Sequence, residues 1–156
     1  MKKRCMGIDQ SYTSTGLVVV REGKRAPLVY DNIKTSTKFG TTDERIQFII
    51  DNIMGMVETF QPDVVAVESL AWGMVGKGQV FQLGELSGAI KAALHRGGVN
   101  FHVANIGTWK KWFTGNGNAG KPLVISHALQ LWPECPLNTD IADSYGIARW
   151  GLDNLD

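Results

Sequence analysis

Cysteine is scarce in this sequence, and strong net charge and long hydrophobic runs are missing. Only Cys5 and Cys135 occur among the 156 residues. Two unclustered cysteines argue against a disulfide framework or a zinc site and indicate reduced thiols. The net charge is +1, so any contact with nucleic acid must come from local basic clusters. No apolar run is long enough to span a bilayer, and no signal-peptide core follows Met1. We therefore expect a cytoplasmic protein with no membrane contact.

Strand and helix signals alternate along the chain, which is long enough for one domain over residues 1–156. Two apolar strand segments flank a polar turn over residues 11–16, and a third strand follows over 28–34, which predicts an antiparallel meander. Behind a capping box at Thr41 and Glu44, apolar residues recur at helical spacing as far as Phe60. We then expect strands over 64–67 and 99–104 and helices over 80–95, 122–131 and 140–151. The pattern predicts an α/β fold with a mixed five-stranded sheet flanked by helices.

Four acidic residues stand at positions that favour a shared site. Asp9 and Glu68 each end a predicted buried strand, and Asp140 and Asp143 lie three residues apart in the first turn of the last helix. Helix dipoles favour acids at helix N-termini, which would explain the helical pair without any function. Together, however, the four carboxylates form the oxygen ligand set that Mg²⁺ or Mn²⁺ prefers. Two such ions could clamp the attacking and leaving oxygens of a phosphodiester.

A basic, glycine-rich segment lies before the helix predicted over 122–131. Its pattern satisfies Gly-x-Gly-x-x-Gly, but no strand precedes it, and Pro122 stands where a Walker loop needs Ser or Thr. Backbone amides, lysines and a helix N-terminus can still receive a phosphate, which makes a nucleic-acid backbone a natural ligand. The alternative is a solvated loop. The candidate contacts are Lys110, Lys111, Gly115, Asn116, Gly117 and Lys121.

Two further features are open to two interpretations each. Trp72 follows Glu68 in a glycine-rich stretch, where it could stack on bases or simply cover the edge of the core. Gly84 and Gly88 lie one turn apart in the helix predicted over 80–95, where small residues allow the close approach of another helix from this chain or a second copy.

The ordered set of motifs resembles the RuvC-type Holliday-junction resolvases of the RNase H-like superfamily, from Gly7 to about Ala148. The resemblance rests on Gly7-Ile8-Asp9 with Thr15-Gly16, Phe60-Gln61-Pro62-Asp63 through Glu68, Gln82-Leu83-Gly84 with Gly88-Ala89-Ile90, Lys110-Lys111 with Thr114-Gly115-Asn116-Gly117 and Lys121, and Asp140-Ile141-Ala142-Asp143. Gln10-Ser11 replaces the family's common Pro-Gly, and the family's base-stacking aromatic would fall near Ala71, which leaves that role to Trp72 or to no residue. These departures favour a distant branch, of phage or prophage origin.

The resemblance implies a metal-dependent endonuclease with an RNase H-like fold, which cuts four-way junctions or other branched DNA in recombination and repair. It implies two Mg²⁺ or Mn²⁺ ions at Asp9, Glu68, Asp140 and Asp143, with Lys121 also catalytic. It further implies a homodimer, for which Leu83, Gly84, Ser87 and Gly88 are the candidate interface.

Three other functions fit part of the sequence. The segment from Gly7 to Gly16 is also similar to the phosphate-1 loop of sugar kinases, but 156 residues cannot build their two domains. A ribonuclease acting on RNA–DNA hybrids would use the same acids. A junction-binding protein without catalysis is disfavoured, because a pure binder has no reason to gather negative charge against phosphate.

Overall fold

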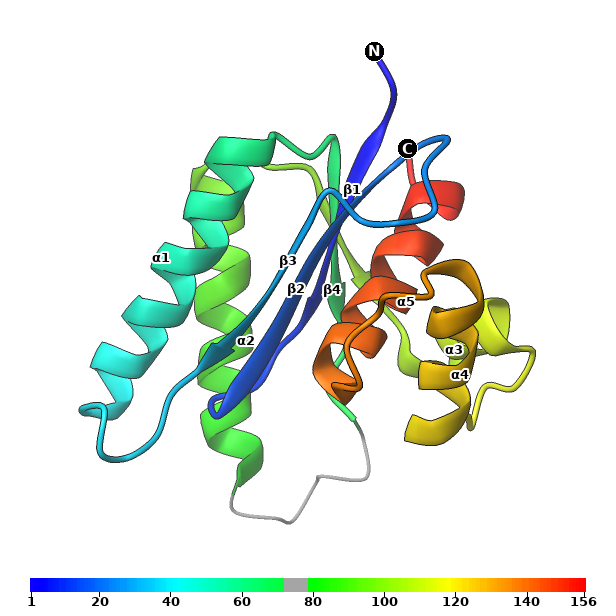
Figure 1. The fold of residues 1–156 in the computed structure, drawn as a ribbon. Helices are drawn as coiled ribbons and strands as arrows, with labels where there is room; N and C mark the ends of the chain where they lie inside the picture. The colour runs from blue at the N-terminus through cyan, green and yellow to red at the C-terminus, as the bar shows by residue number, and fades with distance from the viewer. Residues whose placement is uncertain (72–78) are drawn as a thin grey trace.

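The computed structural model describes residues 1–71 and 79–156, and its centre is a five-stranded sheet (Figure 1). The strand order is β3-β2-β1-β4-β5. The strands β1, β2 and β3 are antiparallel neighbours, whereas β1, β4 and β5 run parallel to one another. The predicted mixed sheet with an early meander is therefore confirmed. The strands are β1 (Arg4–Asp9), β2 (Ser14–Arg21), β3 (Val29–Lys34), β4 (Val64–Glu68) and β5 (Phe101–Ala104).

Helices cover both faces of this sheet, as Figure 1 shows. One core lies between the sheet and two of them, α1 (Thr42–Phe60) and α2 (Gln79–Arg96), and includes Met6 and Ile8. The other core lies between the opposite face and α3 (Ile106–Thr114), α4 (Lys121–Leu131) and α5 (Thr139–Asn154). The central strands are thus covered on both sides, which explains their unbroken apolar runs.

The ends of the helices follow local capping chemistry. Thr41 and Glu44 form the predicted capping box at the start of α1, and Gln61 ends that helix in the left-handed conformation with φ of 44°. Asn138 caps α5 through bonds from the backbone N–H groups of Asp140 and Ile141. The helix α4 begins at Lys121, one residue before the predicted start at Pro122. Residues 109–113, whose sequence is compatible with a helix or with irregular structure, lie within α3 (Ile106–Thr114).

Both chain termini lie at one end of the sheet, away from the β1–β2 turn and the start of α5 (Figure 1). The Lys3 Nζ atom donates a hydrogen bond to the carbonyl oxygen of Leu155, and Asn100 Nδ2 donates to that of Asp156 at 2.8 Å. The C-terminal residues are therefore tied to the sheet end where β1 begins. Among the helices described, none is long and apolar enough to cross a bilayer.

Candidate active site

Strand alternation places two carboxylates on the face of the sheet that α5 covers. Side chains in a strand point to alternate faces. In β1, Met6 and Ile8 pack towards α1 and α2, so Asp9 points to the opposite face. In β4, Val67 packs towards α1 and α2 as well, so Glu68 also points to the face that α5 covers. Because Ile8 is paired with Val67 in the parallel register, Asp9 and Glu68 end neighbouring strands side by side.

Two glycines let α5 lie directly on this part of the sheet. A Cβ atom at Gly7 would collide with the backbone oxygen of Ser144, and one at Gly16 would collide with that of Asp140. The close approach brings the first turn of α5, with Asp140 and Asp143, over the ends of β1 and β2. The four acids predicted to share a site, all half-buried, therefore converge at one end of the sheet.

The charges of these acids interact strongly. Burial raises the pKa of Asp9 well above its ordinary value, and the nearby charges of Glu68, Asp143 and Asp140 raise it further. The interaction between the Asp9 and Glu68 side chains raises the pKa of Asp9 and lowers that of Glu68. Burial also raises the pKa of Glu68, and it raises that of Asp143 to about 7, with the charge of Glu68 contributing. The cluster thus carries fewer negative charges at neutral pH than its composition suggests.

Polar groups around the acids fix their orientation. Trp109 Nε1 donates to Glu68 Oε1 at 3.1 Å, and Ser14 Oγ donates to Asp140 Oδ2 at 2.5 Å. Gln10 Nε2 donates at 2.7 Å to the backbone oxygen of Glu68, which ties the turn after β1 to the end of β4. Gln10 therefore stabilises this turn, although the resolvases that the sequence resembles commonly have proline at this position.

The predicted basic segment divides into lysines near the acids and groups further away. The positive charges of Lys110 and Lys121 reach the acid cluster, because both lower the pKa of Asp143 against the effect of burial. Lys110 also lowers that of Glu68, and its Nζ atom lies 5.7 Å from the centroid of the Trp109 ring. Lys111 is exposed and follows Lys110 on α3.

The glycine-rich turn after α3 has its own geometry. Gly115 ends α3 with φ of 84°, a conformation that favours glycine, and its N–H donates to the Lys111 oxygen. Asn116 accepts a bond from the Asn118 N–H through its side chain. Gly117 lies close to Gly107, so the turn folds back against the start of α3.

The ligand set suits a hard divalent cation by its chemistry, since all four groups offer carboxylate oxygens. The negative charges of Glu68, Asp143 and Asp140 raise the pKa of Asp9, and a cation bound among these carboxylates would relieve that repulsion. No three Asp, Glu, His or Cys side chains in the described residues are already arranged around one point as a metal site requires. Binding would therefore draw these carboxylates closer together.

The four residues predicted at a dimer interface do not share one side of α2. Leu83 packs on the core beneath the helix, and Ser87 is buried with only 2 % of its surface exposed. Added Cβ atoms at Gly84 and Gly88 would meet open space. Only these two glycines face outwards, because 3.6 residues per turn place Leu83 and Ser87 together on the inner side. Trp72 lies outside the described residues.

Sequence reasoning missed the groups that hold the acids. In the sequence, Trp109 belongs to a segment of mixed cationic and aromatic residues. In the structure its ring is fully buried, and the one polar atom of its side chain donates to Glu68. Ser14 reads as a turn residue. The sequence around Trp109 offers a weak signal at best, because its partner lies 41 positions away in the sequence.

Comparison with known proteins points to one family. The family model described as "Crossover junction endodeoxyribonuclease RuvC" matches residues 5–149. A protein of that description from Corynebacterium jeikeium is 32% identical over 149 residues, covering 92% of this chain and 90% of the relative. Another from Brevibacillus brevis is 30% identical over 149 residues, covering 93% and 89%.

Solved structures give the same result. The structure of Thermus thermophilus RuvC has a TM-score of 0.79 at 28% identity, covering 93% of this chain and 90% of its own. The T. thermophilus RuvC complex with a Holliday junction substrate has a TM-score of 0.80 at 25% identity, covering 94% and 90%. The yeast mitochondrial resolvase Ydc2 shares the fold, with a TM-score of 0.66 at 14% identity, covering 96% and 78%.

Proposed function

Because this chain belongs to the RuvC family of crossover junction endodeoxyribonucleases, we propose that it is a DNA endonuclease that resolves Holliday junctions by metal-dependent phosphodiester hydrolysis. The observation that carries the proposal is the convergence of four carboxylates, from β1, β4 and α5, beside Lys110 and Lys121. A negative cluster flanked by lysines suits a phosphate bound through cations. We place this reaction in the cytoplasm, where the DNA of a bacterial cell lies.

We assign the ligands of two Mg²⁺ or Mn²⁺ ions to Asp9, Glu68, Asp140 and Asp143. Held by these four residues, the ions would supply Lewis-acid chemistry for an attacking water and for the leaving oxygen of the phosphodiester. Because burial and neighbouring charges raise the pKa values of Asp9 and Glu68, metal binding by these groups would compete with proton binding. Trp109 and Ser14 hold Glu68 and Asp140 in place through their hydrogen bonds.

Two of the lysines neutralise the substrate in this proposal. Lys121 at the start of α4 is exposed, and its charge reaches Asp143, so it can contact both a phosphate and the cluster. Lys110 lies near Glu68 in the same way. Lys111 and the turn at Gly115, Asn116 and Gly117 would contact the DNA backbone further from the cut bond.

A four-way junction has two strands to cut symmetrically, which implies a two-fold dimer. The outward side of α2 supports this assembly, since Gly84 and Gly88 leave open space beside the exposed ring of Phe81, which is 81% accessible. Helices can approach closely over small residues. We therefore assign the dimer contact to this side of α2.

The decisive experiment compares end-labelled four-way junction, linear duplex and RNA–DNA hybrid, each with Mg²⁺, Mn²⁺ or EDTA. We expect cutting of the junction alone, dependent on the metal and absent in Asp143→Asn. The matched control is Asp153→Asn, the same change at an exposed position in the last turn of α5. Preferred cutting of the hybrid would instead assign a ribonuclease. Junction binding without cutting under any condition would leave only a binding protein.

A further inference from the structure

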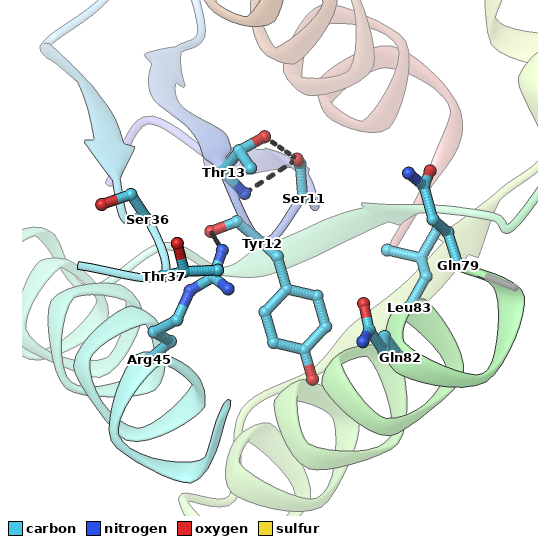
Figure 2. Close-up of a pocket in the computed structure, with 9 residues that line it drawn as sticks. All are labelled: Ser11, Tyr12, Thr13, Ser36, Thr37, Arg45, Gln79, Gln82 and Leu83. Carbon is cyan, nitrogen blue, oxygen red and sulfur yellow. Dashed lines mark hydrogen bonds between the residues drawn. The ribbon is translucent and has the colours of Figure 1, made fainter. Parts of the chain in front are cut away.

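A cavity of about 580 Å³ lies on the opposite side of the sheet end from α5, beside the turn that follows Asp9. Its walls come from this turn, from the segment after β3 and from the first turns of α1 and α2 (Figure 2). Hydroxyl groups from Ser11, Thr13, Ser36 and Thr37 surround it, together with the guanidinium group of Arg45. No residue of the candidate active site lines this cavity.

Arg45 is held firmly at this cavity. Its Nε atom donates to Thr35 Oγ1 at 2.9 Å, and Nη2 donates to the backbone oxygen of Tyr12 at 3.3 Å. The guanidinium carbon also lies 5.2 Å from the centroid of the Tyr12 ring. Figure 2 shows Arg45 on one side of Tyr12 and Gln79 and Gln82 of α2 on the other. A guanidinium has five N–H donors, so the two bonds leave donors for a further acceptor at the cavity.

The turn itself is braced by its own hydroxyl groups. Ser11 Oγ accepts bonds from the N–H groups of Thr13 at 3.3 Å and Ser14 at 3.4 Å, and Thr15 Oγ1 donates to the Ser11 oxygen at 2.5 Å. Thr35 Oγ1 donates to the same Tyr12 oxygen that Arg45 contacts. The turn and Arg45 are therefore set in place before any ligand arrives, which reduces the entropy lost on binding.

The cavity is close to the acids although it faces the other way. Ser11 follows Asp9 by two residues, so their Cα atoms are at most about 7.6 Å apart. Thr13 precedes Ser14, which donates to Asp140. On the far side of the acids stand Lys110 and Lys121, from α3 and α4. Lys110 and Lys121 therefore lie beside the carboxylates, and Arg45 lies beside the turn that follows Asp9, on the other side of this sheet end.

From this arrangement we propose that Arg45, with the hydroxyl groups around it, binds the phosphodiester next to the scissile one, on the side away from Lys121. A guanidinium matches the oxygens of a phosphate with paired N–H donors, and the hydroxyls add further donors. Asp43 and Glu85 also act on Tyr12, so the region is not uniformly positive, and Arg45 supplies the specific contact. The inference rests on the proposed function, because it needs a DNA strand crossing the acid cluster.

The test is a cycle that combines one protein change with one DNA change. Junction binding is measured in EDTA, where no cutting occurs, with Arg45→Gln and with a neutral methylphosphonate at the phosphate next to the cleavage site. We expect Arg45→Gln to weaken binding about 10-fold at 0.1 M salt and to reduce the slope of log K against log salt by about 0.9. The methylphosphonate should weaken wild-type binding about 10-fold but the variant less than 2-fold.

Two further variants separate charge at this cavity from other effects. Arg96→Gln removes an exposed positive charge at the far end of α2, about 25 Å along the helix from Gln79, and should keep the full methylphosphonate effect. Thr37→Asp places a negative charge at the exposed rim of the cavity, where folding does not depend on the side chain. It should weaken binding as strongly as Arg45→Gln while the melting temperature stays unchanged.

The inference would be overturned if Arg45→Gln and the methylphosphonate weakened junction binding independently of each other at every phosphate near the cleavage site. It would also be overturned if Thr37→Asp bound the junction with wild-type affinity. If Arg45→Gln fails to fold, the junction affinity of Thr37→Asp tests the inference.

The proposed function is tested separately, by junction cutting in Mg²⁺. A wild-type protein that binds junctions with the expected coupling but never cuts them would refute the nuclease and retain the Arg45 contact.

Discussion

Asp143→Asn should make the metal-free protein more stable at neutral pH while abolishing cleavage. Burial and the charge of Glu68 raise the pKa of Asp143 from 3.8 to about 7 in the folded protein. Because the folded pKa lies above the unfolded one, the folded state binds more protons between these values. The contribution of Asp143 to the free energy of unfolding is therefore greatest below about pH 4 and is lost as the pH rises through about 7. Asparagine has the same shape without the charge and avoids this loss.

The magnitude follows from the size of the shift. A rise of about 3 pKa units corresponds to about 4 kcal/mol at 1.36 kcal/mol per unit, which is an upper limit because water can enter the site. We expect about half of this, roughly 2 kcal/mol, to be recovered by Asp143→Asn at pH 8. For a chain of this length that corresponds to a rise in Tm of about 4–8 °C.

Thermal melting followed by circular dichroism in EDTA, at pH 5 and pH 8, measures this difference. The Tm advantage of Asp143→Asn should grow from pH 5 to pH 8, whereas the exposed control Asp153→Asn should show no such trend. Mg²⁺ should then raise the Tm of the wild type more than that of Asp143→Asn, because a ligand that binds only the folded state stabilises it. An equal Tm difference at both pH values, or a less stable variant, would refute the assigned electrostatics.

The remaining predictions address the hydrogen bond to Glu68, the DNA contact of Lys121 and the dimer contact on α2. Trp109→Phe removes the hydrogen bond to Glu68, so the pKa of Glu68 should rise and the pH–rate profile for cleavage should shift to higher pH; an unshifted profile would contradict this role. Lys121→Ala should reduce the salt slope of junction binding by about 0.9, and an unchanged slope would make Lys121 a solvated residue. Gly88→Arg fills the open side of α2 and should give a monomer in sedimentation at unchanged Tm, whereas a persistent dimer would place the interface elsewhere.

Local signals in the sequence were sufficient for most of the fold. The capping box at Thr41 and Glu44 marks the start of α1, because this cap depends on residues only three positions apart. The sequence offers Asn138 or Thr139 as the cap of α5, and the structure shows Asn138 in that role. Strand alternation also places Asp9 and Glu68 on a common face once both are assigned to strand ends. The common face of the two strand acids could be predicted for this reason, whereas Asp140 and Asp143 were indicated by their spacing on the last helix.

The groups that position these acids could not be predicted in the same way. Trp109 reaches Glu68 only because α3 packs beneath α5, and Arg45 reaches Tyr12 only because α1 lies against the β1–β2 turn. Both contacts join residues more than 30 positions apart. Likewise, Ser87 looks suited to a contact with a partner until the packing of α2 turns it inwards. Such relations depend on tertiary packing, for which no local pattern exists.

The location of both chain ends has a practical consequence for anyone handling this molecule. The N- and C-termini lie together at the sheet end away from the β1–β2 turn and the start of α5. An affinity tag or fluorophore fused to either terminus would project away from the acids and from Arg45. Surface-immobilised protein would then present its catalytic end to the solvent, which suits single-molecule observation of junctions in free solution.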